Sequence, residues 1–301
     1  MKNVVIINKK ANHAKDMIKH IKKNFDSNDT RVYYIKNPKK LLNIASKVIG
    51  EHPQRIIVGG GDGTINSIAH KVARTDIKLG VLPLGTANDF AKTMEIPTDI
   101  NQSLEIANGE SYKKIDLGAV EKNIGQTWSQ KRDFNFFLNV ATIGIGSKIP
   151  LEMNTKLKRL TGALAYRVAS VNAFMKFKKF DIKITFLDEN KIVEHKNVFH
   201  VAIGNGKYYG GGMLVSPHAD ITNHLFDIYV AEAHSLIDIV KVLRLIKKGE
   251  LNKANNVFHY QSKRLYIETN TKYPINLDGE IKSHTPAYFA VQENAIDVIV
   301  K

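Results

Sequence analysis

The chain has 301 residues, 43% of them hydrophobic, and a net charge of +15, so it can form about two globular domains and its partners are expected to be anionic. It has no cysteine, which excludes disulfides, a thiol nucleophile and zinc–thiolate sites and agrees with a reducing cytosol. No apolar run approaches the roughly 20 residues that span a bilayer, and the short apolar stretch at the N-terminus indicates a first strand rather than a signal peptide.

Strands that alternate with helices are expected over the first third of the chain. The predicted strands are Val4–Ile7, Arg31–Ile35, Ile56–Val58 and Leu79–Leu82. Apolar residues at helical spacing follow each of them, and Gly50 and Gly109 are expected to end two of the helices. This alternation predicts a parallel sheet with helices on both faces.

A glycine-rich turn follows the predicted strand Ile56–Val58. It reads Gly-Gly-Gly-Asp-Gly-Thr over residues 59–64, and a helix with Ile65, Ile68 and Val72 on one face begins directly after it. Glycine lets a ligand approach the backbone, and a helix N-terminus attracts anions. The turn therefore predicts a phosphate site, although one such βα turn alone could be an ordinary loop.

A second loop of this kind follows the next strand. Residues 83–90 read Pro-Leu-Gly-Thr-Ala-Asn-Asp-Phe. Two neighbouring loops at the carboxyl edge of one parallel sheet form the place where open α/β folds bind ligands. Near the N-terminus, Lys9 and Lys10 follow the first strand, where they could face the same phosphate or be solvated lysines beside a turn.

The pattern changes to mostly β structure after about Lys113. The predicted strands are 115–118, 134–140, 182–186, 198–203, 226–230, 265–269 and 275–277, and we expect them to form an antiparallel sandwich. Two helices interrupt them. Residues 235–248 begin with Ser235 and Asp238 spaced as a capping box. Residues 155–178 combine an apolar stripe with seven nearby basic residues that include Lys156, Lys158 and Arg159, which indicates either a solvated basic face or a face that rests on an anionic membrane.

The two loops, GGGDGT and PLGTANDF, resemble the nucleotide-binding signature of the diacylglycerol kinase catalytic-domain family, which includes bacterial lipid kinases and the sphingosine and ceramide kinases. GGDGT alone is also similar to the loop of NAD kinases and ATP-dependent phosphofructokinases, and the Thr-Ala-Asn-Asp-Phe run separates them. The resemblance covers nearly the whole chain, because later motifs match in the same order. At the first loop only Asn8 clearly matches the family.

The resemblance implies an α/β plus all-β fold. An N-terminal three-layer α/β/α nucleotide-binding domain (residues 1–117 with 287–301) would be followed by a C-terminal antiparallel β-sandwich for the lipid (residues 118–286). The active site would lie in the cleft between them. The return of the C-terminal tail to the first domain comes from the resemblance alone.

The expected activity is transfer of the γ-phosphate of ATP to a lipid hydroxyl, with diacylglycerol and phosphatidic acid as substrate and product, and with Mg²⁺. The residues expected to bind the nucleotide are Asn8, Gly59, Gly60, Gly61, Asp62, Gly63, Thr64, Asn66, Gly85, Thr86, Asn88, Asp89 and Asp116. Asp62 is the main candidate for holding Mg²⁺, and the resemblance adds Asp89 and Asp116 as parts of a water–magnesium network.

The proton acceptor is expected in the segment Asp278-Gly279-Glu280, where the family resemblance places it. The two acids could share the task, and as strand residues they would point to the same side unless a turn intervenes. Asp-Gly is also a common hairpin turn, so a purely structural role is the alternative. The sequence leaves open which acid is closer to the substrate.

A structural Mg²⁺ site is expected to be weak in this chain. Many bacterial relatives carry an Asp-Asp-Gly turn where this sequence has Asp220 to Leu225, and Asn223 replaces the aligned carboxylate. Backbone carbonyls of Asp220 and Leu225 could still bind a metal, which the neutral Asn223 amide would hold less tightly.

The predicted protein is thus a cytoplasmic lipid kinase, peripherally associated with the inner face of the membrane, whose partners are a nucleotide and a lipid in an anionic surface. Nucleic acid is not expected, because no recognition motif is found. The oligomeric state is left open, a homodimer included. The alternatives are an NAD kinase-like enzyme on a soluble substrate and a non-catalytic basic membrane-binding protein on a degenerate kinase fold.

Overall fold

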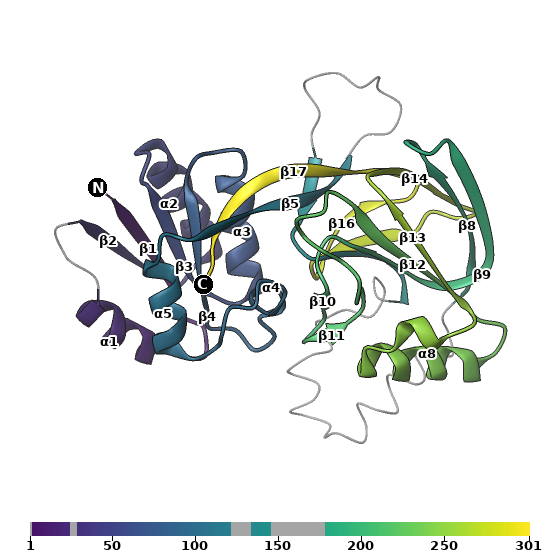
Figure 1. Cartoon of the computed structure of the whole chain (residues 1–301), viewed down its shortest axis with the longest axis horizontal. Coiled ribbons are helices and arrows are strands. Elements are labelled where there is room, and N and C mark those ends of the chain that lie inside the picture. The colour runs from purple at the N-terminus through teal and green to yellow at the C-terminus, as the bar shows by residue number, and fades with distance from the viewer. Residues whose placement is uncertain (1, 25–28, 122–133, 146–177) are drawn as a thin grey trace. The chain divides into compact units, whose positions relative to one another are not determined.

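A computed structural model describes residues 2–24, 29–121, 134–145 and 178–301, and Figure 1 shows its elements. The chain divides into two compact units: unit 1 contains residues 1–117, 221–223 and 292–301, and unit 2 contains residues 118–220 and 224–291. The chain therefore changes unit within two strands, β5 (Tyr112–Glu121) and β17 (Ala287–Ile299), and on either side of residues 221–223. The predicted division differs in assigning 287–291 to the first domain and 221–223 to the second.

Unit 1 contains a parallel sheet with the strand order β2-β1-β3-β4, to which the C-terminal part of β17 adds. Its strands and helices are β1 (Asn3–Asn8), α1 (Ala14–Asn24), β2 (Thr30–Ile35), α2 (Pro38–Gly50), β3 (Arg55–Gly60), α3 (Asp62–Val72), β4 (Lys78–Pro83), α4 (Asp89–Thr93) and α5 (Ile100–Asn108). The predicted alternation of strands and helices is confirmed.

Helices cover both faces of this sheet (Figure 1). On one face, α1 and α5 share a buried cluster with Val5, Ile7 and Ile57. Since side chains alternate along a strand, Ile6 and Ile56 point to the other face, where α3 packs on β3 and on α2. All six residues of β3 are buried, as expected for a central parallel strand. The three-layer α/β/α arrangement is confirmed.

Helix ends follow the predictions in one of two places. Gly109 is the C-cap of α5. Gly50, however, is still helical, and His52 is the residue that takes the left-handed conformation with φ 48°. The backbone N–H of His52 binds the carbonyl of Ile49, so the turn after α2 closes without using the conformational freedom of glycine.

Unit 2 is built of antiparallel strands. They are β6 (Phe134–Phe137), β7 (Val140–Gly144), β8 (Phe180–Phe186), β9 (Lys191–Gly204), β10 (Tyr208–Tyr209), β11 (Met213–Leu214), β12 (Phe226–Glu232), β13 (Val257–Ser262), β14 (Arg264–Thr269), β15 (Pro274–Leu277) and β16 (Glu280–His284). The long strand β9 pairs with β7, β8 and β12. A buried cluster that includes Phe137, Phe226 and Phe289 forms the core.

The predicted strand 134–140 is in fact two strands, β6 and β7, which a turn at Leu138 and Asn139 separates. The apolar run does not reveal this turn, because Leu138 and Asn139 are buried as well. Strands β13 and β16 were not predicted from the sequence either. Their side chains are mostly exposed or half-buried, so they lack a strong apolar signal.

The helix α8 (Leu236–Lys248) packs on unit 2. The predicted capping box is confirmed: the Ser235 hydroxyl accepts a hydrogen bond from the backbone N–H of Asp238, and the Asp238 carboxylate accepts one from that of Ser235. Hydrogen bonding from the backbone N–H of Ser235, and then from its side chain, lowers the pKa of the Asp238 carboxyl. The other predicted helix of this half, 155–178, lies outside the described residues except at Lys178. In the part of the chain that the structure describes, no helix is long and apolar enough to cross a membrane.

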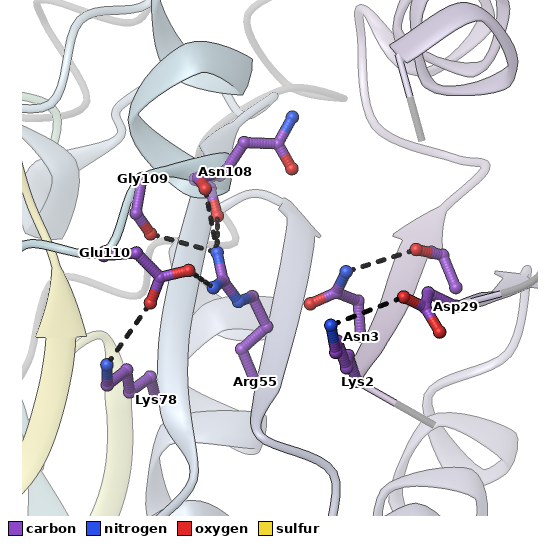
Figure 2. Close-up of polar contacts among 10 residues, drawn as sticks. Lys2, Asn3, Asp29, Arg55, Lys78, Asn108, Gly109 and Glu110 are labelled. Atoms are coloured by element: carbon purple, nitrogen blue, oxygen red, sulfur yellow. Dashed lines mark hydrogen bonds and ion pairs between the residues drawn. The ribbon is translucent and has the colours of Figure 1, made fainter. Parts of the chain in front are cut away.

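The N-terminal end of β3 is anchored to the C-terminal end of α5 (Figure 2). The buried Arg55 guanidinium donates hydrogen bonds to the carbonyls of Asn108 and Gly109, both at 3.0 Å, and pairs with Glu110. A cation at a helix C-terminus binds carbonyls that have no partner within the helix. Glu110 also pairs with Lys78 of β4 at 3.7 Å, so this contact joins two strands and a helix.

Candidate active site

The glycine loop lies at the C-terminal end of β3, where the chain turns into α3. Gly61 is the N-cap residue in an extended conformation, and no side chain caps the helix. The carbonyl of Gly61 accepts hydrogen bonds from the N–H groups of Thr64 and Ile65. The first turn of α3 thus presents backbone N–H groups and the positive end of the helix dipole, as the sequence predicted.

The second loop touches the first one through two glycines. A Cβ atom at Gly85 would lie 2.6 Å from the Cα of Gly61, and a Cβ at Gly61 would lie 3.3 Å from the Cα of Gly85. The backbone N–H of Leu84 also donates to the carbonyl of Gly60 at 2.9 Å. The two loops therefore meet through bare backbone, which requires glycine on both sides.

Gly63 differs from the other glycines of this loop. A Cβ at Gly60 would lie 2.6 Å from the Cβ of Thr64, so protein packing alone explains that glycine. A Cβ at Gly63, in the first turn of α3, would have nothing within 4 Å. Glycine inside a helix costs about 1 kcal/mol relative to alanine. Packing does not explain Gly63, whereas close approach of a ligand would.

The side chain of Asn88 shapes the second loop. Its Oδ1 accepts a hydrogen bond from the N–H of Gly85, its Nδ2 donates to the carbonyl of the same residue, and its backbone is left-handed with φ 51°. Asp62 then ties this loop to the glycine loop, since its Oδ1 accepts a hydrogen bond from the N–H of Phe90 at 3.1 Å.

The first loop, after β1, joins the same group. Asn8 donates from Nδ2 to the hydroxyl of Thr64, and Asn12 donates to that of Thr86, both at 3.0 Å. Asn12 was not predicted as a site residue, because its contact with Thr86 forms only in the folded chain. Lys9 has its ammonium 5.8 Å from the centre of the Tyr34 ring. Asn66 is buried on α3.

Two carboxylates lie close together in this part of unit 1. Burial raises the pKa of Asp62, the N–H of Phe90 lowers it, and the charge of Asp89 raises it again. A divalent cation beside Asp62 would relieve both the burial and the repulsion, because it favours the charged form of both groups. The residues present therefore suit a magnesium ion, and Asp62 remains the main candidate ligand.

Asp116 occupies a different place in unit 1. It is buried on β5, and its Oδ1 accepts a hydrogen bond from the backbone N–H of Asn294 at 2.8 Å. Its own backbone N–H donates to the carbonyl of Ile221. This carboxylate joins β5 to the C-terminal part of β17. Its participation in a magnesium network stays a prediction.

The Asp278-Gly279-Glu280 segment of unit 2 is a tight hairpin turn between β15 and β16. Asp278 and Gly279 both have positive φ, 48° and 101°, as in the turns that join paired strands. Glu280 lies opposite Leu277 in the ladder. A turn therefore intervenes between the two acids, which is the exception that the prediction allowed, and the strand argument for both side chains pointing the same way does not apply.

The carboxylate of Asp278 is bound by three consecutive backbone N–H groups. Leu138 donates to its Oδ2 at 2.5 Å, and Asn139 and Val140 donate to its Oδ1 at 3.0 Å each. Asp278 therefore holds the turn between β6 and β7, a role the sequence could not reveal. The Glu280 carboxylate is 67% exposed and pairs with Lys282 at 2.7 Å.

The predicted structural metal site contains a single carboxylate, Asp220, with Asn223 and Leu225. Among the described residues, no group of three or more His, Cys, Asp or Glu side chains could hold a metal ion. The magnesium sites therefore stay predictions.

Two models of known protein families match this chain. Residues 2–120 match the model of the diacylglycerol kinase catalytic domain, and residues 139–300 match that of the YegS C-terminal NAD kinase beta sandwich-like domain. Two domains with these folds in this order are those of a kinase. The chain belongs to the family of YegS-like and diacylglycerol kinase-like lipid kinases, as the sequence predicted.

Two relatives support this membership. A probable lipid kinase, YegS-like, from Shewanella frigidimarina is 31% identical over 266 residues, which cover 86% of this chain and 81% of the relative. A diacylglycerol kinase from Staphylococcus aureus is 28% identical over 256 residues, which cover 84% and 76%.

Two solved structures agree in fold. A diacylglycerol kinase from Bacillus anthracis has a TM-score of 0.72 at 21% identity, covering 100% of this chain and 97% of that one. Yeast NADH kinase in complex with NADH has a TM-score of 0.52 at 11% identity, covering 100% and 84%.

Proposed function

We propose that this protein transfers the γ-phosphate of ATP to the hydroxyl of a lipid, with diacylglycerol as the substrate and phosphatidic acid as the product. The observation that carries the proposal is the contact between the glycine loop and the second loop at Gly61 and Gly85, in a chain of this family. The names of the relatives support the choice of lipid.

The nucleotide would bind with its phosphates at the first turn of α3. Backbone N–H groups there have no side-chain cap, and Gly63 leaves open space beside them. Asn8, Thr64, Asn88 and Thr86 hold the three loops in place through the hydrogen bonds described above. In this proposal Gly59, Gly60, Asn66 and Asp89 support the loops from within.

Asp62 would hold a magnesium ion together with the phosphates, and Asp89 and Asp116 would be further members of a hydrated network. Magnesium suits such a site because it prefers a few carboxylates plus water and phosphate oxygens. When bound, the ion supplies neutralisation of charge on the transferred phosphoryl group.

In the reaction, the lipid oxygen forms a bond to the γ-phosphorus, the bond between that phosphorus and the β–γ bridging oxygen breaks, and ADP leaves. The hydroxyl proton passes to a carboxylate. We assign the proton to Glu280 and a positioning role to Asp278, because the oxygens of Asp278 already accept three backbone N–H bonds.

The protein would act in the cytoplasm at the inner face of the membrane, where its lipid substrate is found. The net charge of +15 favours an anionic surface. Asp220, Asn223 and Leu225 would form at most a weak structural magnesium site, since only one of them supplies a carboxylate.

A radiolabelled ATP assay tests the activity. The purified chain is given diacylglycerol, monoacylglycerol, a sphingoid base, phosphatidylglycerol and NAD in turn, with Asp62→Asn as the inactive control. We expect a labelled lipid from diacylglycerol. Phosphorylation of NAD alone would refute the lipid assignment in favour of the soluble-substrate alternative. A folded chain that binds vesicles but turns over no acceptor would favour the non-catalytic alternative.

A further inference from the structure

The helix α8 has a second apolar face that is exposed in the part of the chain that the structure describes. Its inner face, Ile239, Val242 and Ile246, is buried in a core cluster of unit 2. On the outside, Leu236 is 50% exposed, Ile237 65% and Val240 46%. Other large exposed hydrophobic residues of the described chain, such as Tyr112 and Ile192, lie far apart in the sequence. Scattered ones are normal, but three within five residues indicate an interaction surface.

The same outer face is strongly basic. Lys241, Arg244, Lys247 and Lys248 are exposed on α8. At 100° per residue, Arg244 and Lys248 continue the line of Ile237, and Lys247 continues the line of Leu236 and Val240. The acid of the helix, Asp238, is turned toward the helix start, where it accepts hydrogen bonds from the N–H groups of His234 and Ser235.

The acid that follows the helix is also engaged. Glu250 pairs with Lys253 at 2.8 Å. The outer face of α8 therefore offers apolar side chains in its first turns and cations in its last turns. This combination of a well-buried inner side with an apolar and basic outer side is typical of helices that lie on a bilayer surface.

We infer that the outer face of α8 docks on the surface of an anionic lipid bilayer. Leu236, Ile237 and Val240 would enter the region between head groups and acyl chains, and the four cations would contact lipid phosphates. A second copy of the chain is not expected to bind this face, because a symmetric contact would bring the four cations of each copy together and they would repel one another. This inference rests on the proposed lipid kinase function, for which it names a docking surface.

The docking helix is fixed to the part of unit 2 that also holds Asp278. Ile239, Val242 and Ile246 share their cluster with Val140, and the backbone N–H of Val140 binds the Asp278 carboxylate at 3.0 Å. A bilayer contact at α8 would therefore be transmitted through one core cluster to the turn that carries the candidate acids.

A fluorescence experiment tests the contact directly, because the chain has no cysteine. Ile237→Cys and Ile192→Cys are each labelled with a polarity-sensitive dye. Ile192, on β9, is 57% exposed and is the matched control. With vesicles that contain about 30% phosphatidylglycerol, we expect a blue shift and brighter emission only at position 237, and a weaker signal as salt screens the charges.

Vesicle sedimentation gives the second measurement. Ile237→Ser, and separately Lys241→Gln with Lys248→Gln, should lower partition onto anionic vesicles about tenfold, whereas Ile192→Ser and Lys71→Gln with Lys196→Gln should not. Activity on diacylglycerol in neutral detergent micelles should be unchanged in all four variants, since none changes a residue of the candidate site.

The outcomes separate this inference from the proposed activity. Equal partition of wild type and α8 variants, or no response at position 237, overturns the inference even if the kinase is active. A lipid-free dimer that Ile237→Ser dissociates overturns it in favour of an interface between copies. Docking that depends on α8 in a chain that phosphorylates no lipid supports the inference and refutes the proposed function.

Discussion

Among single residues, Gly63 is a position where a substitution should change the stability of the fold and the affinity for ATP in opposite directions. Its position is helical and nothing surrounds a Cβ there, so Gly63→Ala should stabilise the fold by up to about 1 kcal/mol. If phosphates approach this backbone, the same methyl group should weaken ATP binding about tenfold or more. Thermal melts and calorimetric titration with ATP measure the two effects.

Gly50 provides the matched control for this test. It lies at the end of α2 with nothing within 4 Å of a Cβ, so Gly50→Ala should not change ATP affinity. Gly61 is unsuitable, because a side chain there would press on the backbone of Gly85 and would disturb the fold together with the site. If Gly63→Ala binds ATP as tightly as wild type, the proposal that a phosphate binds at the first turn of α3 is refuted.

Asp278 and Glu280 should respond differently to replacement by their amides. Asp278→Asn keeps an oxygen for the N–H groups of Asn139 and Val140, but it replaces the oxygen that accepts from Leu138 with an NH2 donor, and we expect a loss of about 1–3 kcal/mol in the free energy of unfolding. Glu280→Gln, at an exposed side chain, should change it by less than about 0.5 kcal/mol. Urea unfolding measures both values.

The kinetic comparison of the same two variants tests the assignment of the proton. Glu280→Gln should lower kcat by about 10²-fold with little change in the KM for ATP. If Glu280→Gln keeps wild-type kcat while a folded Asp278→Asn loses it, then Asp278 is the proton acceptor and the roles proposed above are reversed.

Asp62 should make the folded protein less stable as the pH rises, which is the opposite of the usual effect of a carboxylate. Its pKa is raised in the folded state, chiefly by burial, so the wild type loses stability as pH rises from the unfolded value through the raised one. Asp62→Asn removes this loss and keeps the oxygen that binds the N–H of Phe90. Without magnesium, the variant should therefore melt higher than wild type at pH 7.

The difference should narrow as the pH falls toward 4, because the wild-type carboxyl then becomes neutral as well. Melts of both proteins in chelator across this range measure the effect. If Asp62→Asn is less stable than wild type at pH 7, then the charge of Asp62 stabilises the fold. Repulsion between Asp62 and Asp89 in the absence of metal would then be too weak to lower the stability of the wild type.

At the scale of elements, the contact of Arg55 with α5 fixes the far end of β3 (Figure 2). Arg55→Lys removes the planar group that serves the carbonyls of Asn108 and Gly109 at once, and should cost about 1–2 kcal/mol. ATP affinity should stay unchanged, because the glycine loop lies at the other end of the strand.

The pH dependence of this contact follows from Glu110. Hydrogen bonding to Arg55, and then the charge of Arg55, lower the pKa of Glu110, so its contribution to stability is present above the unfolded value and is lost as pH falls through the folded one. Glu110 is exposed, so this contribution is small. If the loss of stability caused by Arg55→Lys changes strongly near pH 4, then Glu110 contributes more to stability than expected here.

At the scale of the whole molecule, β17 makes unit 1 depend on the far end of the chain. Val298 pairs with Leu79 of β4, and the N–H of Asn294 binds Asp116. Residues 1–120 alone would leave the buried strand β4 at an open edge, which favours aggregation. We expect this fragment to melt without cooperativity and to bind no ATP, although it includes the whole match to the catalytic domain.

A chain that joins residues 1–117 to 292–301 by a glycine–serine linker is the control, and it should recover a cooperative melt. Circular dichroism and calorimetry with ATP compare the two. Cooperative folding and ATP binding by residues 1–120 would show that β17 is dispensable for unit 1.

The parallel strands and the longer helices of unit 1 could be predicted from the sequence, as could the position of the glycine loop between a strand and a helix, whereas the short helix α4 was not predicted. These features are local: apolar periodicity, glycine in a turn and the capping box at Ser235 each depend on residues within one or two turns of each other. The same local signal was misleading where a turn is buried, as at Leu138 and Asn139, and where strands are exposed, as in β16.

The contacts between the loops and the contacts of the acidic side chains could not be predicted, because they form between residues far apart in the sequence. Asn8 and Thr64 are 56 positions apart, and Asp278 and Leu138 are 140 apart, so no spacing rule relates them. Asp278 could be recognised as a turn residue from Asp-Gly, but the three N–H groups it binds come from the start of β7 and the turn before it. Likewise, the apolar periodicity of α8 marks a helix, while only its packing reveals that Leu236, Ile237 and Val240 remain outside, because burial is decided by what the rest of the chain covers.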